Sequence, residues 1–225
     1  MAISVATAKP ATSSQTHATG TTTFTTASVT PTANRLLVLA IGTLQAAVSA
    51  VSGCGLTWTQ IGLQTNNTRT NVWAAWTGDS PSSGAITITM AAKEKSICYT
   101  GFEIIGGYYD GNVNNCFKQR ASESHNASAS AAGVLPNSFQ PGSMTFYVMT
   151  NNTDSTANLT AERTSIANVA TTNTGSRIRF GAQYYLGEDL SITFSWTGSI
   201  TGGGIVYEFL EARSEFPRTT MILQD

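Results

Sequence analysis

The sequence predicts an all-β protein, an antiparallel β-sandwich of about ten strands. Three observations lead to this fold class. Charged residues make up 11% of the 225 residues, less than half of the roughly 25% that is usual for soluble domains. The surface residues that replace them are Thr, Ser, Ala, Asn and Gly, and only four lysines remain, whereas helical surfaces normally carry many Lys, Glu, Gln and Arg. Short apolar segments also recur at regular intervals from Thr21 onward, with turn residues between them.

Three segments alternate between apolar and polar residues, which is the pattern of a strand with one buried face. The clearest is residues 190–197, and the others are residues 86–90 and 177–184. We expect each of them to turn its apolar side chains toward a core.

Three further segments are apolar on both faces, namely residues 36–41, 144–149 and 205–210. Such runs are typical of central strands that a second layer, or a neighbouring molecule, covers. Weaker strand patterns complete the expected sandwich, at residues 22–29, 56–61, 71–77 and 96–105.

The chain divides by composition into an extended N-terminal arm at residues 1–20, a sandwich domain at residues 21–212 and a C-terminal tail at residues 213–225. The arm holds almost no large apolar side chain, so either its own domain or a neighbouring molecule must hold it in place. Within the domain, residues 120–137 are rich in Ser, Ala and Asn. They are either a long loop or the boundary between two smaller β-units.

The tail contains large apolar residues beyond the last expected strand. They either cap the parent sandwich or reach a partner, and we take them as candidate assembly contacts. These residues are Phe216, Met221, Ile222 and Leu223.

Composition argues against several classes of function. A formal net charge of −1 and a pI near 6.1 offer no basic surface for nucleic acid. The longest apolar run is far shorter than the roughly 18 residues of a membrane-spanning helix. The N-terminus lacks the basic and apolar regions of a secretory signal, so we expect synthesis in a cytoplasm.

No cofactor is expected, because the sequence shows no metal-binding or phosphate-binding motif. Cys54, Cys98 and Cys116 have no metal-ligand spacing and are interpreted as reduced and structural. Calcium held by loop carbonyls and single acids remains an open alternative. Gly202-Gly203-Gly204 precedes a strand, so it indicates a turn or bulge rather than a phosphate loop.

The sequence also shows no catalytic pattern, so we expect a protein that is not an enzyme. Paired carboxylates on one strand face are missing, and Glu103 and Glu208 are interpreted as satisfied or edge-facing acids. There is no G-x-S-x-G motif, and neither His17 nor His125 has an orienting acid at a recognisable spacing.

Aromatic residues offer one alternative function. Tyr108 and Tyr109 precede Asp110-Gly111 at an expected loop tip, so they are candidate glycan contacts, although packing in the core or at its rim is the simpler interpretation. Trp73 and Trp76 differ in parity, so they should face opposite sides of one strand.

An internal repeat is not evident. Residues 55–59 and 194–198 resemble each other, but their flanking sequences do not agree.

Four segments together resemble the Thr/Gly-rich, jelly-roll-like proteins encoded among the structural genes of tailed bacteriophages. The resemblance covers roughly residues 30–211 and rests on strand and turn patterns. The segments are Ala33-Asn34-Arg35-Leu36-Leu37-Val38, Gly55-Leu56-Thr57-Trp58-Thr59, Trp76-Thr77-Gly78 and Gly204-Ile205-Val206-Tyr207-Glu208-Phe209.

This resemblance implies a virion component and carries over no catalytic residue. We therefore expect a non-enzymatic capsid decoration (cement) protein that is assembled in the host cytoplasm and exposed on the particle surface. Its expected partners are the major capsid protein and copies of itself, with a trimer favoured. The alternative is a tail-associated carbohydrate- or receptor-binding module that uses Tyr108 and Tyr109, and a polysaccharide-cleaving enzyme is the least favoured.

Overall fold

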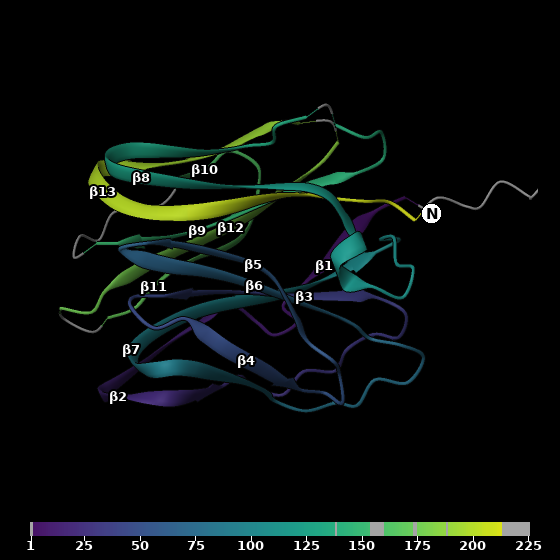
Figure 1. The fold of residues 1–225 in the computed structure, drawn as a ribbon, viewed down its shortest axis with the longest axis horizontal. Coiled ribbons are helices and arrows are strands. Elements are labelled where there is room, and N and C mark those ends of the chain that lie inside the picture. The colour runs from purple at the N-terminus through teal and green to yellow at the C-terminus, as the bar shows by residue number, and fades with distance from the viewer. Residues whose placement is uncertain (1, 138, 154–159, 173–174, 188, 213–225) are drawn as a thin grey trace, which may run out of the picture.

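The computed structural model describes residues 2–137, 139–153, 160–172, 175–187 and 189–212. Two antiparallel sheets face each other across a common core, as Figure 1 shows. The predicted all-β sandwich is therefore confirmed. No helix in the described part is long and apolar enough to cross a membrane.

The first sheet has seven strands in the order β1-β7-β3-β6-β5, and β2 and β4 also pair with β7. Its strands are β1 (Ser4–Thr7), β2 (Ser13–Thr25), β3 (Leu36–Thr43), β4 (Val48–Gly53), β5 (Thr59–Asn66), β6 (Thr68–Trp76) and β7 (Ile86–Ile105).

The second sheet has six strands in the order β10-β13-β9-β12-β11, and β8 pairs with β13. Its strands are β8 (Phe117–Val134), β9 (Met144–Asn152), β10 (Thr160–Ala161), β11 (Thr164–Ala170), β12 (Ile178–Leu186) and β13 (Ser191–Phe209).

The two halves of the chain share one topology. The six strands from β2 to β7 pair with one another in the same pattern as the six strands from β8 to β13. In this pattern β3 corresponds to β9, β6 to β12 and β7 to β13. A linker of residues 106–116, which contains a short 3-10 helix at Val113–Asn115, joins the halves. The sandwich is thus two similar β-units, and their boundary lies at this linker rather than at residues 120–137.

Each half covers the outer face of its own central strands. The first part of β7, residues 86–94, pairs with β4 and with the end of β2, whereas its second part, residues 96–105, pairs with β3, with β1 and with the start of β2. A hydrophobic cluster on the outer face joins Ile88 of the first part to Leu39 of β3. In the same way Phe194 of β13 packs in a cluster with Tyr147 of β9. Figure 1 shows these folded-back strands below and above the two facing layers. The central strands were predicted to be covered on both faces, and this is confirmed, since every residue of β3 is buried.

The N-terminal arm is part of the first sheet. Residues 4–7 and 13–16 pair with the second part of β7, so of the two alternatives the arm packs on its own domain. Backbone pairing holds this segment, which is why it needs no large apolar side chains.

Residues 120–137 were expected to be a long loop or a boundary between two units, and both interpretations are wrong, because residues 120–134 belong to β8. At the buried position Gly133, the lack of a side chain reflects close packing. A Cβ added to Gly133 would lie 2.7 Å from Cβ of Val206 and 2.9 Å from Cδ2 of Tyr147. Small residues therefore allow the folded-back strand to approach the sheet beneath it.

Most expected buried faces are observed. Ile192, Phe194 and Trp196 are buried, whereas Leu190 is 38% exposed. Residues 178–183 were expected to keep one polar face in solvent, and this is wrong, because both faces are buried. The outer face is covered by β13, where the Gln183 amide donates a 2.7 Å hydrogen bond to the carbonyl of Thr193.

The glycine run at 202–204 lies inside β13, next to a register shift between Ile200 and Gly202. The bulge interpretation therefore holds. A Cβ on Gly202 would lie 2.3 Å from the carbonyl oxygen of Thr150, so this position accepts no side chain. The three cysteines are free and buried, as expected for structural residues.

Candidate functional site

A cleft of about 410 Å³ lies at one end of the first half, where the linker meets the ends of β5 and β6. None of its lining residues is charged. They are Gly55, Leu56, Thr57, Thr59, Trp76, Thr77, Gly78, Tyr109, Gly111, Asn112 and Val113. Its volume falls within the range of about 300–1,000 Å³ that is usual for small-molecule sites.

Two stacked aromatic rings form the apolar part of this cleft. The rings of Trp76 and Tyr109 lie nearly parallel, at an interplanar angle of 7°, with their centroids 4.3 Å apart. Trp76 is the last residue of β6 and packs against the central core, as predicted from its opposite parity to Trp73. The linker supplies Tyr109. The stack thus joins a strand of the first sheet to the segment that connects the two halves.

Asp110 organises the linker next to this stack. Its carboxylate accepts hydrogen bonds from the Asn115 amide at 2.8 Å, from the Asn112 backbone N–H at 3.1 Å and from the Tyr108 hydroxyl at 3.3 Å. The hydrogen bond from Asn115 is the main cause that lowers the pKa of Asp110, and the negative charge of Asp110 raises the pKa of Tyr108. An ionised Asp110 therefore favours this loop conformation.

The structure separates the two tyrosines that the sequence analysis selected together. Tyr109 lines the cleft, whereas Tyr108 binds Asp110 and is not among the lining residues. Trp76 was considered only as one of several aromatic residues, and the stack that it forms joins residues more than thirty positions apart. No sequence signal indicated that contact.

Two threonine hydroxyls of the cleft have no hydrogen-bond partner among the described residues, those of Thr57 and Thr59. The Thr77 hydroxyl is already used, because it accepts from the Arg35 N–H at 2.8 Å and donates to the Arg35 carbonyl at 3.1 Å. The cleft therefore combines aromatic surface with uncommitted hydroxyl groups.

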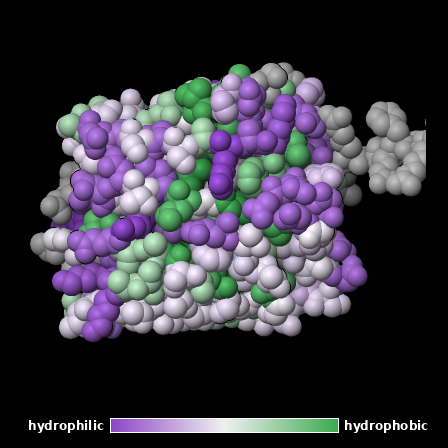
Figure 2. Space-filling model, viewed as in Figure 1, coloured by the Kyte–Doolittle hydropathy of each residue, from purple (hydrophilic) through white to green (hydrophobic). Residues whose placement is uncertain are grey.

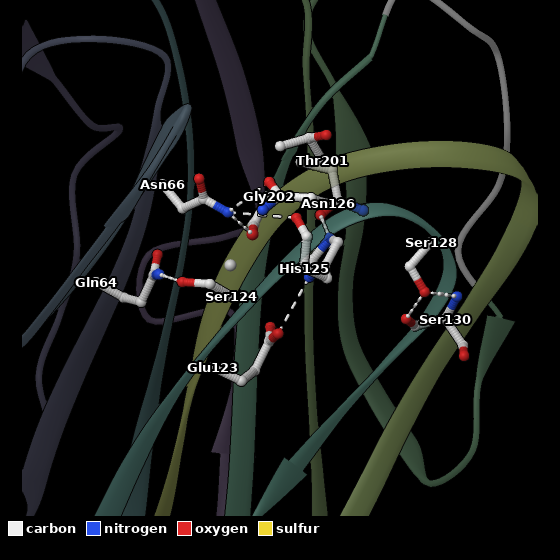
Figure 3. A network of polar contacts seen from close by, with 12 residues as sticks. Gln64, Asn66, Glu123, Ser124, His125, Asn126, Ser128, Ser130, Thr201 and Gly202 are labelled. Atoms are coloured by element: carbon white, nitrogen blue, oxygen red, sulfur yellow. Dashed lines mark hydrogen bonds and ion pairs between the residues drawn. The ribbon is translucent and has the colours of Figure 1, made fainter.

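A second polar cluster lies where β5 of the first half meets β8 of the second half (Figure 3). His125 Nδ1 lies 3.1 Å from a carboxylate oxygen of Glu123, and His125 Nε2 lies 2.9 Å from Oδ1 of Asn151. Tyr147 donates to the other oxygen of Glu123 at 2.7 Å. The prediction that His125 has no orienting acid is wrong, because residues two apart on a strand share a face.

This cluster holds the two halves together. The Gln64 amide donates to the Ser124 hydroxyl at 2.6 Å, and the Asn66 amide donates to the Gly202 carbonyl at 2.9 Å. Both nitrogens of the His125 ring face Glu123 and Asn151, so no hydroxyl among the described residues is placed for activation by the ring. The arrangement is a network of hydrogen bonds between the two halves, and it does not pair a nucleophile with a general base.

The structure also places the two glutamates on which a carboxylate mechanism would depend. Glu103 and Glu208 are 1% and 0% exposed, and each accepts a backbone hydrogen bond from the loop before a central strand. They lie in different sheets. In the described residues, no group of three or more His, Cys, Asp or Glu side chains is placed to hold a metal ion.

Two long edge strands form the other candidate functional feature. Among the described strands, β2 pairs only with β7 and β8 pairs only with β13. Neither β2 nor residues 124–134 of β8 contain Asp, Glu, Lys, Arg or Pro. Charged residues and Pro are the usual protection of an edge against pairing with another chain.

The four candidate assembly contacts in the tail, Phe216, Met221, Ile222 and Leu223, lie outside the described residues.

Comparison with known proteins finds no matching family model, no matching curated protein and no matching solved structure.

Proposed function

We propose that this protein is a non-enzymatic structural component of a tailed-phage particle, a capsid decoration protein that joins its neighbours by adding strands to its open sheet edges. The observation that carries the proposal is the pair of edges, on β2 and on residues 124–134 of β8, that contain no charged residue or Pro and pair on one side only among the described strands. Strand addition supplies backbone hydrogen bonds without charged side chains, which suits a surface so poor in charge.

The exposed apolar residues support a contact surface on the second half. Of the five large hydrophobic residues that are exposed in the described chain, only Leu63 belongs to the first half, and the others are Val134, Tyr185, Leu186 and Leu190. Figure 2 shows hydrophobic residues as small separate groups on one face, between hydrophilic and pale residues. Small groups of this kind suit several modest contacts in a symmetric array.

The duplication makes Leu186 the counterpart of Trp76. Trp76 pairs with the first residue of β3, and Leu186 pairs with the first residue of β9. In the first half, the linker covers Trp76 with Tyr109, whereas Leu186 is 45% exposed. The second half thus lacks, among its described residues, the cover that the first half has.

The test measures the mass of the purified protein in solution and its co-sedimentation with empty capsids from the same source. The edge variant carries Ala129→Lys and Ala132→Lys, both at exposed positions of β8. Its matched control is Ser195→Lys, which places a lysine at an exposed position of β13, between two paired strands.

We expect the unaltered protein to form a closed oligomer, a trimer by preference, and to bind capsids. The edge variant should lose oligomer or capsid binding, whereas the control should keep both. A monomer that ignores capsids, or equal behaviour of the two variants, would overturn the proposal. Removal of residues 213–225 tests the tail in the same assay.

A further inference from the structure

We infer that the cleft lined by Trp76 and Tyr109 is a binding site for a neutral sugar ring. This inference does not depend on the proposed role in a particle. It concerns a different surface from the β8 edge and can fail while that role stands.

The cleft has the surface chemistry of a carbohydrate site. A sugar ring presents C–H groups on its faces and hydroxyl groups at its rim, so it pairs with an aromatic face and with neutral hydrogen-bonding groups. Trp76 and Tyr109 cover one face of each other, and the aromatic surface that lines the cleft is the part of the stack that this contact leaves free. The Thr57 and Thr59 hydroxyls have no partner within the described chain. The exposed Asn112 belongs to the same lining.

Charge selects the class of sugar. The lining contains no Lys or Arg that could bind a phosphate, sulfate or carboxylate group. The only charged residue of the linker segment 106–116 is Asp110, which carries negative charge beside the cleft. We therefore expect neutral sugars to bind better than acidic ones.

The cleft is also arranged before any ligand arrives. Asp110 holds Asn112 and Asn115 through its two carboxylate oxygens, and Trp76 is fixed at the end of a paired strand. A site whose groups are already ordered loses less entropy when it binds.

The experiment applies the full chain to a glycan array with neutral and acidic oligosaccharides, and then titrates the retained glycans by calorimetry. Tyr109→Ala removes the linker ring of the stack, and Thr57→Val replaces one uncommitted hydroxyl at an exposed position while keeping its shape. The matched control is Tyr185→Ala, which removes a tyrosine ring that is exposed in the second half.

We expect neutral glycans to bind and Tyr109→Ala to weaken their affinity by about tenfold or more, as for the loss of a central aromatic contact. Thr57→Val should weaken binding by a smaller factor, and Tyr185→Ala should leave it unchanged. If Tyr109→Ala fails to fold, Thr57→Val decides the outcome. No retained neutral glycan, or equal affinities for the Thr57 and Tyr185 variants, would overturn the inference.

Discussion

Glu103 and Glu208 perform the same task in the two halves of the molecule. Glu103 pairs with the second residue of β3 and accepts a 2.6 Å hydrogen bond from the backbone N–H of Thr32. Glu208 pairs with the second residue of β9 and accepts a 2.5 Å hydrogen bond from the backbone N–H of Gln140. Each buried carboxylate thus fixes the chain that enters a central strand, so the duplication extends from topology to a side-chain role.

Replacing either glutamate by alanine should destabilise the fold, because the backbone N–H of the loop before a central strand loses its acceptor. Glu208 also accepts from the Gln119 amide at 2.6 Å, so we expect Glu208→Ala to cost more than Glu103→Ala. Hydrogen bonds to charged groups are worth about 1.5–3 kcal/mol each. Urea denaturation of both variants measures the difference. A larger loss for Glu103→Ala would contradict the contribution of the Gln119 hydrogen bond, and no loss in either variant would contradict the shared role.

Gly133→Ala should destabilise the second half by about 1–3 kcal/mol, the usual cost of overpacking. The added methyl group would meet Val206 and Tyr147 in the layer below. Gly84→Ala is the matched control, because no atom lies within 4 Å of its added Cβ. Thermal unfolding, monitored by circular dichroism, compares the two variants. Equal midpoints would contradict the close packing of β8 on Val206 and Tyr147.

Deletion of residues 1–20 should destabilise the domain, because it removes β1 and part of β2 from their pairing with β7. A freely extended arm would predict a truncated protein of unchanged stability. Chemical denaturation of the full and truncated chains distinguishes the two.

Acidification should release the linker loop at the cleft. The pKa of Asp110 is lower in the folded protein than the ordinary value of an aspartate, near 4. The ionised carboxylate therefore stabilises the folded state at a pH above this ordinary value, and the stabilisation is lost as the pH falls through the folded-state pKa. NMR signals of the linker amides should shift in that acidic range, and Asp110→Asn should abolish this titration. An unchanged titration in the variant would assign it to another group.

Cys98 and Cys116 should resist alkylation in the native protein. Burial raises the pKa of both thiols, that of Cys116 to about 12, so little of the reactive thiolate exists near neutral pH. Mass spectrometry after iodoacetamide treatment should find both residues modified only once the chain is unfolded. Equal rates of alkylation in the native and the unfolded protein would contradict the burial of the two thiols.

Only part of the candidate cleft is predictable from the sequence. Tyr109 could be selected because it precedes a turn-forming Asp-Gly pair, and the opposite parity of Trp73 and Trp76 indicated that one of them faces away from the outer layer. The stacking of Trp76 on Tyr109 could not be predicted, because the whole of β7 separates the two residues in the chain. The contact of Glu123 with His125 was readable from their spacing, but it depended on recognising residues 120–134 as a strand.

The sequence by itself indicated the central strands and most of their buried faces, because alternation and apolar runs are local properties of the chain. It also indicated a neutral, hydroxylated surface. It did not indicate β1, β4, β8 or β11, whose residues carry neither pattern clearly. Only the tertiary structure decided the partners of each strand, the duplication of the unit and the cleft at the linker. These depend on contacts between residues far apart in the chain, where β3 and β9 share a role without sharing a recognisable sequence, since many apolar sequences fill the same buried strand.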